Sequence, residues 1–162
     1  MPMSALKNIL SIASDHAGFK LKEILYNFLI SNGYNVLNFG TNSTSSVNYP
    51  EFAFKVVSSI INNEVSGGIL ICGTGIGMAM IANKFPGIRA ACCSDVYSAK
   101  MSKLHNNANI LTLGGRMIGE DLAQEIVLTW INTDFEGGRH QRRIDMLDEL
   151  PKESWIKFTG GK

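Results

Sequence analysis

The sequence has few cysteines, and none of them has the spacing of a metal site or a disulfide framework. Its 162 residues include three cysteines, Cys72, Cys92 and Cys93, two of which are adjacent, and no Cys-x-x-Cys pair occurs. Such a set argues against a disulfide-stabilised fold and against a zinc knuckle. A reducing compartment suits this chain best, and we expect a cytoplasmic protein.

An excess of charge of either sign is also lacking. Fifteen Lys and Arg residues oppose fourteen Asp and Glu residues, for a formal net charge of +1. A protein that binds nucleic acid mainly through phosphates usually has a marked positive excess, so we expect no nucleic-acid partner. The hydrophobic fraction of 45% and the charged fraction of 18% are ordinary for a globular domain and exclude a disordered chain.

Signals for export or membrane insertion are missing as well. Residues 1–14 lack the long apolar core and the small-residue cleavage site of a signal peptide. Residues 65–83 are uncharged over nineteen positions, which is close to the length of a membrane span, but five glycines interrupt them. We therefore expect no membrane partner, and a strand, a loop and the start of a helix in this segment.

Apolar runs of strand length alternate with segments of helical periodicity along the chain. The predicted strands cover residues 9–14, 34–39, 68–72, 88–93 and 109–113. The predicted helices cover residues 19–32, 50–61, 77–84, 95–105, 119–133 and 139–150. This alternation predicts an α/β protein with a three-layer, Rossmann-like fold, in which helices cover both faces of a five-stranded parallel sheet. We expect a single domain over residues 1–150 and a C-terminal extension over residues 151–162.

Ligands of open parallel sheets bind outside the carboxyl ends of the strands, so the residues after each predicted strand are the first candidates for a site. They are unusually rich in glycine and in polar side chains. These residues are 14–16, 40–41, 72–77, 94–95 and 114–116.

The segment Cys-Gly-Thr-Gly-Ile-Gly at residues 72–77 has the most distinctive composition. It is not a dinucleotide-binding fingerprint, because Met78 stands where the third glycine belongs, and it has no Walker A lysine. A thiol at the end of a strand and beside a helix N-terminus is a plausible base or nucleophile, although Cys72 could also be a buried strand residue. Thr74 is either a turn residue or a hydroxyl that stabilises an oxyanion.

Two histidines have both a structural and a functional interpretation. Asp15 and His16 follow the first strand and either cap the next helix or face a ligand as an acid–imidazole pair. His105 lies near the end of a predicted helix, where histidines often cap. His16, His105, His140 and the cysteines are possible metal ligands in principle, but no His-x-x-x-His, His-x-His or Cys-x-x-Cys spacing occurs, so we expect no metal site.

Arginines near the C-terminus are candidates for an anion site. Arg139 and Arg143 are four residues apart, which places both on one face of a helix, where two guanidinium groups suit a phosphate. Arg116, which follows a strand and two glycines, is a third candidate. The alternative for the pair is a solvated basic turn.

Taken in order, several strings resemble the B-type ribose-5-phosphate isomerases, a family of sugar-phosphate isomerases that includes galactose-6-phosphate isomerase. The resemblance covers about residues 9–147. The strings are SDHAGFKLK, YPEFA, GGILICGTGIGMAMIANKFPGIRAA, SAKMSKLHNNANILTLGGRMIG and FEGGRHQRR.

The resemblance implies a role for each matching position. Cys72 matches the general base that moves a proton between C1 and C2 of the sugar, and His105 matches the group that opens the sugar ring and donates a proton. Thr74 and its loop match the part that holds the enediolate, and Asp15 completes the implied catalytic group. The implied substrate contacts are Asp15, His16, Tyr49, Gly73, Thr74, Gly75, Ile76, Gly77 and Asn106, and the implied phosphate contacts are His16, Arg116, Arg139 and Arg143.

The resemblance further implies an aldose–ketose isomerase for ribose 5-phosphate and ribulose 5-phosphate that needs no metal and no organic cofactor. Members of the family form homodimers whose active sites draw residues from both subunits. Three alternatives stay open: an isomerase of a six-carbon sugar phosphate such as allose 6-phosphate or galactose 6-phosphate, a metal-dependent enzyme, and a non-catalytic module that binds sugar phosphates.

Overall fold

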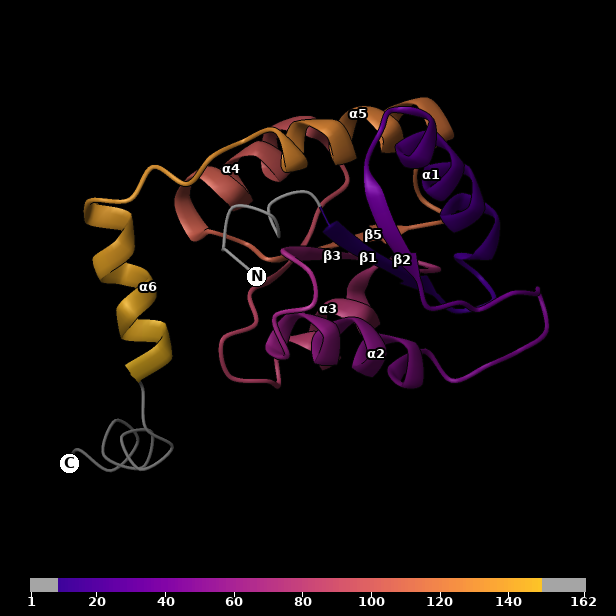
Figure 1. Cartoon of the computed structure of the whole chain (residues 1–162), viewed down its shortest axis with the longest axis horizontal. Helices are drawn as coiled ribbons and strands as arrows, with labels where there is room; N and C mark the ends of the chain where they lie inside the picture. The colour runs from indigo at the N-terminus through magenta and orange to yellow at the C-terminus, as the bar shows by residue number, and fades with distance from the viewer. Residues whose placement is uncertain (1–8, 150–162) are drawn as a thin grey trace.

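The computed structural model describes residues 9–149, and five strands in this range form one sheet. The order across the sheet is β2-β1-β3-β5-β4, and every neighbouring pair is parallel. The predicted five-stranded parallel sheet is therefore confirmed (Figure 1). The strands are β1 (Ile9–Ser14), β2 (Asn35–Asn38), β3 (Gly67–Cys72), β4 (Ala90–Cys92) and β5 (Ile110–Gly114).

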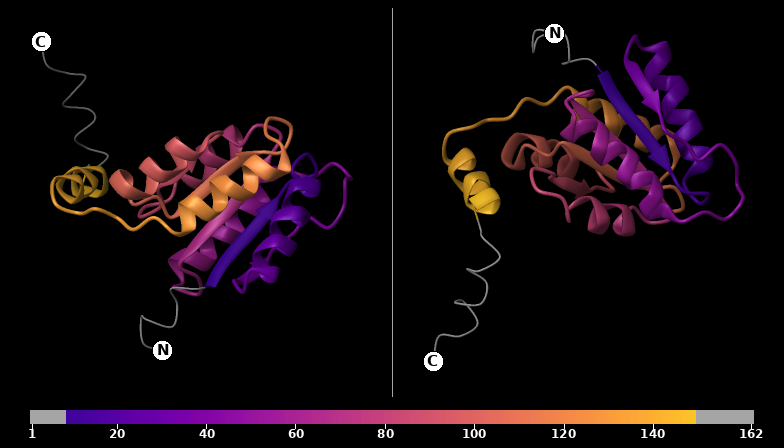
Figure 2. Two further views of the ribbon diagram at one scale, coloured as in Figure 1. Left: turned by 90° about the horizontal axis from the view of Figure 1, so that it is seen from above. Right: turned by 60° about the horizontal axis from the view of Figure 1, so that its bottom comes forward.

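Helices cover both faces of the sheet, as the sequence predicts. Apolar side chains of α1, α4 and α5 pack on one face, and those of α2 and α3 pack on the other (Figure 1). The sixth helix, α6, stands apart from these layers and packs against α4 (Figure 2). The helices are α1 (Phe19–Ser31), α2 (Tyr49–Ile61), α3 (Ile76–Ala82), α4 (Val96–Asn106), α5 (Glu120–Ile131) and α6 (Arg139–Glu149).

The structure explains why the sequence of the central strand β3 is continuously apolar. All six of its residues are buried, because helices cover both faces of the sheet at its centre. Ile69 and Ile71 pack on the face covered by α1, α4 and α5, whereas Leu70 and Cys72 pack on the α2–α3 face. This alternation places the Cys72 thiol on the α2–α3 face, at the carboxyl edge of the sheet.

The predicted boundaries agree with the structure to within two residues, and the fourth strand is shortened most in proportion to its length. It was predicted over residues 88–93 but spans only Ala90–Cys92. The amide of Ile88 donates to Phe85 O in a tight turn, so this residue cannot join the ladder. Asp95 caps α4, since its side chain accepts from Ser98 N. The predicted extension over residues 151–162 lies outside the described residues.

No helix within residues 9–149 is both long enough and apolar enough to cross a membrane.

Candidate active site

Cys72 ends β3 and lies beside Gly114 of β5 in the parallel ladder. The chain then turns through Gly75, whose φ of 81° belongs to the left-handed region that glycine adopts readily. A side chain there would also collide with β5, because its Cβ would lie 2.9 Å from the carbonyl carbon of Leu113. In this turn the Gly75 N–H donates to Cys72 Sγ at 3.1 Å, so the positive end of an amide dipole points at the sulfur.

The Cys72 side chain is buried, with 6% of its surface exposed, and it packs among apolar residues of the α2–α3 face. Burial agrees with the structural interpretation of this cysteine, and its place at the end of a strand agrees with the functional one. Thr74 also serves the local turn, since its Oγ1 accepts from Ile76 N at 3.3 Å.

Asp15 and His16 follow β1 at the same edge of the sheet. One carboxylate oxygen of Asp15 accepts from Ala17 N and Gly18 N at 2.9 and 3.0 Å, so Asp15 closes the turn before α1, whereas the N-cap of the helix itself is Gly18 and has no side-chain cap. Both bonds use Oδ1, and Oδ2 accepts none from the described residues. His16 Nδ1 accepts from Val47 N at 3.3 Å, which puts the proton of a neutral imidazole on Nε2. An N–H donor is thus available for an oxygen of a ligand.

Two further side chains border the 73–77 loop. Tyr49, the first residue of α2, packs against Gly77 so closely that a Cβ there would lie 3.0 Å from its ring carbon Cζ. Near the other end of the loop, Arg116 N donates to Gly73 O at 3.1 Å, and a Cβ at Gly73 would lie 3.7 Å from Arg116 Nη1. We name the residues gathered at this edge the thiol group. They are Asp15, His16, Tyr49, Gly73, Thr74, Gly75, Ile76, Gly77, Cys72 and Arg116.

The other predicted site residues lie at the opposite edge of the sheet. Helix α4 starts after β4 at the carboxyl edge and runs back, so His105 and Asn106 at its end lie near the start of β5. In Figure 1, β1 runs towards the right of the view, while α6 lies at the far left. Arg139, His140 and Arg143 belong to α6. We name these five residues the imidazole group.

The strand-end candidates in residues 14–16, 72–77 and 114–116 therefore gather at one edge within one chain, whereas the residues that the resemblance added to them, His105, Asn106, Arg139 and Arg143, lie at the other edge. The five residues of β5 alone separate the two edges by about 16 Å. The thiol group and the imidazole group do not meet in a single copy of the chain.

The imidazole group has a close internal arrangement. The rings of His105 and His140 stack with centroids 4.2 Å apart and an angle of 8° between their planes. Glu136 Oε2 lies 3.9 Å from Nε2 of each histidine. A cavity of about 330 Å³ opens beside them. Its lining residues are His105, Asn106, His140, Arg143, Ile144 and Leu147.

His140 is a member of this group that the sequence suggested only as a possible metal ligand. Burial lowers its pKa below the ordinary value of 6.5; His105, Arg139 and Arg143 lower it further, and Glu136 opposes them. The ring is consequently neutral near pH 7, and it accepts a hydrogen bond from Arg139 Nε at 3.4 Å. Its position directly after Arg139, one of the paired arginines, is the sequence signal that could have placed His140 in the site.

His105, Glu136 and His140 also offer three potential metal ligands whose donor atoms lie within 4.8 Å of one another. Two features oppose coordination. The imidazole planes are parallel, so the nitrogen lone pairs run side by side and do not converge on one point. His140 Nε2 is already the acceptor for Arg139.

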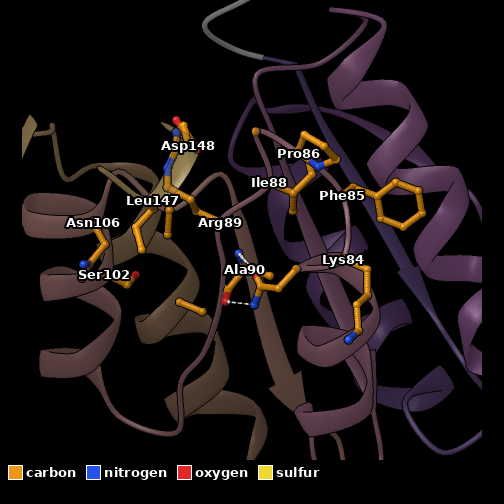
Figure 3. Close-up of a pocket in the computed structure, with 14 residues that line it drawn as sticks. Lys84, Phe85, Pro86, Ile88, Arg89, Ala90, Ser102, Asn106, Leu147 and Asp148 are labelled. Carbon is orange, nitrogen blue, oxygen red and sulfur yellow. Dashed lines mark hydrogen bonds and ion pairs between the residues drawn. The ribbon is translucent and has the colours of Figure 1, made fainter. Parts of the chain in front are cut away.

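A larger cavity of about 820 Å³ separates α6 from the segment that leads into β4 (Figure 3). Asn83 organises one wall, because its amide exchanges two hydrogen bonds with the backbone of Ala90. Arg89 Nη1 reaches Asp148 Oδ2 of α6 at 3.7 Å. Asn106 lines this cavity and the smaller one, which places it between the two.

Comparison with known proteins identifies the relatives of the chain. The family model described as Ribose/Galactose Isomerase matches residues 10–147. Ribose-5-phosphate isomerase B of Escherichia coli K12 is 44% identical over 141 residues, which is 87% of this chain and 95% of that protein.

Solved structures of similar proteins have the same fold. Ribose-5-phosphate isomerase B of Clostridium thermocellum is 48% identical, with a TM-score of 0.88 over 90% of this chain and 99% of that chain. The protein from Mycoplasma genitalium, determined with bound ribulose-5-phosphate, is 41% identical, with a TM-score of 0.84 over 90% of this chain and 97% of that chain.

Proposed function

The chain belongs to the ribose/galactose isomerase family, and we propose from this that it interconverts ribose 5-phosphate and ribulose 5-phosphate through an enediolate. The observation that carries the substrate assignment is the likeness to the Mycoplasma genitalium enzyme with its bound ribulose-5-phosphate, 41% identical over 90% of this chain. The proposed cellular location is the cytoplasm.

Cys72 is the proposed base. Its sulfur takes the proton from C2 of the open-chain aldose, and the electron pair of that C–H bond forms the C1=C2 bond while the carbonyl electrons move to O1. The proton of the C2 hydroxyl passes to O1, and return of the first proton from the sulfur to C1 leaves the carbonyl at C2, so no external oxidant or reductant is needed. The N–H of Gly75, 3.1 Å from Sγ, supports a negatively charged sulfur at this position.

The remaining residues of the thiol group hold the sugar. The Thr74 hydroxyl and the loop amides other than those of Gly75 and Ile76, which already donate to Cys72 Sγ and Thr74 Oγ1, stabilise the charge that develops on O1. Asp15 and His16 contact sugar hydroxyls, and Tyr49 lines the site. Arg116, beside Gly73, provides a guanidinium for the phosphate.

The imidazole group supplies ring opening and the second phosphate anchor. His105 moves the proton between the ring oxygen and the anomeric hydroxyl. Arg139 and Arg143 lie four residues apart on α6 and bind the phosphate, and Asn106 contacts the sugar. Because the phosphate takes no part in the proton transfer, its binding energy serves to place C1 and C2 against the base.

A complete site then requires two copies of the chain. Each copy carries both groups at opposite edges of its sheet, so in a homodimer the imidazole group of one copy completes the thiol group of the other. The position of α6, which stands apart from the layers of its own chain, supports this arrangement (Figure 2).

A direct assay tests the proposal. Ribose 5-phosphate conversion is measured after exhaustive chelation, in parallel with allose 6-phosphate and galactose 6-phosphate. We expect turnover without metal and the highest kcat/KM for ribose 5-phosphate. A higher kcat/KM for a six-carbon substrate would reassign the enzyme within its family, and binding without turnover would indicate a non-catalytic module. Activity lost on chelation and restored by a cation would identify a metal-dependent enzyme.

A further inference from the structure

Lys22 has an unusual environment for a lysine. Its side chain is fully buried in the first turns of α1. Its Nζ lies 2.6 Å from Glu23 Oε1, donates to Asn38 Oδ1 at 3.1 Å, and stands 5.4 Å from the centre of the Phe19 ring. Lysines are almost never fully buried unless paired, and a well-packed apolar side chain is often at least as stabilising. Stability alone is therefore a weak reason for a buried ammonium group here.

Asn38, which accepts the hydrogen bond from Lys22, is connected to the proposed site through further hydrogen bonds. Asn38 ends β2, and the same Oδ1 also accepts from Gly40 N at 3.0 Å. Gly40 O in turn accepts from Ser14 N at 2.7 Å, and Thr41 N donates to Ser14 O at 2.8 Å. Both hydrogen-bonding groups of the Ser14 backbone are thus held by Gly40 and Thr41, and Gly40 donates to the same Asn38 oxygen as Lys22.

Ser14 directly precedes Asp15 and His16, which begin the thiol group. Lys22 lies one helical turn after Gly18, and its backbone N–H donates to Gly18 O at 2.9 Å. The ammonium group consequently joins the start of α1 to the end of β2, and the segment carrying Asp15 and His16 runs between these two anchored points.

We propose that Lys22 is a positioning residue that acts through Asn38 to hold Asp15 and His16 against the sugar. The expected effect of Lys22 on KM rests on the isomerase function proposed above. The hydrogen-bonded connection from Lys22 to Ser14 does not depend on that function. Loss of the ammonium group frees Asn38, loosens residues 40–41 and lets the Asp15–His16 segment shift. Since these two residues contact the sugar before and during the reaction, the loss falls mainly on substrate binding.

The test compares Lys22→Met with the wild-type protein. Methionine keeps the length and apolar stem of lysine but removes the donor and the charge. We expect an unchanged or higher melting temperature and a rise in KM for ribose 5-phosphate of about 10- to 100-fold, the scale of loss that accompanies a misplaced contact. Amide hydrogen exchange should become faster at Ser14, Gly40 and Thr41. The control is Lys20→Met, at an exposed position of the same helix, which should leave all three measurements unchanged.

Asn38→Ala provides a second route, because Asn38 is exposed and its truncation spares the core. It should reproduce the rise in KM and the faster exchange, and it decides the outcome if Lys22→Met does not fold. Normal exchange in the tested variant overturns the link itself, and faster exchange with an unchanged KM overturns the positioning role. Lys22→Arg, which restores a cationic donor, should recover part of the KM. If the wild-type protein fails to convert ribose 5-phosphate, the isomerase proposal fails, and hydrogen exchange still tests the link.

Discussion

Among single residues, Cys72 provides the sharpest test of the proposed chemistry, because its burial also suits a purely structural role. Cys72→Ala removes the proposed base, and we expect kcat to fall by about 100- to 10,000-fold, the usual contribution of a positioned acid–base group. Steady-state assays and binding of ribulose 5-phosphate measure the two effects separately, and binding should persist.

Cys93→Ala is the matched control for the thiol. Cys93 is also buried, and burial raises the pKa of its thiol, but it packs on the opposite face of the sheet. Its truncation should leave kcat unchanged. Full turnover in Cys72→Ala would remove the thiol from the mechanism.

A substitution at Gly77 tests whether Tyr49 lies in the substrate site. The new Cβ in Gly77→Ala would lie 3.0 Å from Tyr49 Cζ and would displace the ring of Tyr49, a residue that is 39% exposed. We expect a raised KM for ribose 5-phosphate with little change in melting temperature. Gly119→Ala is the control, since a Cβ there meets nothing within 4 Å and its φ of −75° suits alanine. An unchanged KM in Gly77→Ala would place Tyr49 outside the substrate site.

At the scale of elements, α4 links the two edges of the sheet, and Asp95 caps its start. The Asp95 carboxylate accepts from Ser98 N at 2.7 Å and from Ser98 Oγ at 2.8 Å, and these bonds lower its pKa below the ordinary value of 3.8. A lowered folded-state pKa means that the stabilisation is complete above the unfolded-state value and is lost as the pH falls through the folded-state value.

Asp95→Ala should therefore lower the melting temperature most at neutral pH. The difference from the wild-type protein should stay constant above about pH 5 and shrink below about pH 4, because acid protonates the cap of the wild-type protein as well. Thermal unfolding followed by circular dichroism across this range measures it. A difference that grew in acid would contradict the role of the charged cap.

At the scale of the whole molecule, the separation of the two groups predicts complementation between inactive variants. Cys72→Ala and His105→Asn disable different groups, so in the proposed homodimer each variant alone should be nearly inactive. Mixed subunits from coexpression should regain about a quarter of wild-type activity, because half of the dimers are hybrids and each hybrid has one intact site of two. Recovery is measured on the purified mixture. No recovery would place each active site within one subunit.

The local sequence determined which segments form strands and helices, and it located the thiol group. Periodicity of apolar residues is a property of neighbouring positions, so the continuously buried β3 and the amphipathic helices could be identified from sequence. The ends of parallel strands meet at one edge, and Asp15, Cys72 and Arg116 could therefore be brought together without coordinates.

Only the tertiary structure decided the order β2-β1-β3-β5-β4, the stacking of His105 on His140 and the burial of Lys22. Each depends on contacts between segments far apart in the chain, and local periodicity does not encode which surfaces meet. For the same reason, the sequence did not reveal how far apart the two groups lie. The resemblance assigned His105 and Cys72 to one reaction, but α4 runs across the sheet and places them at opposite edges of one chain.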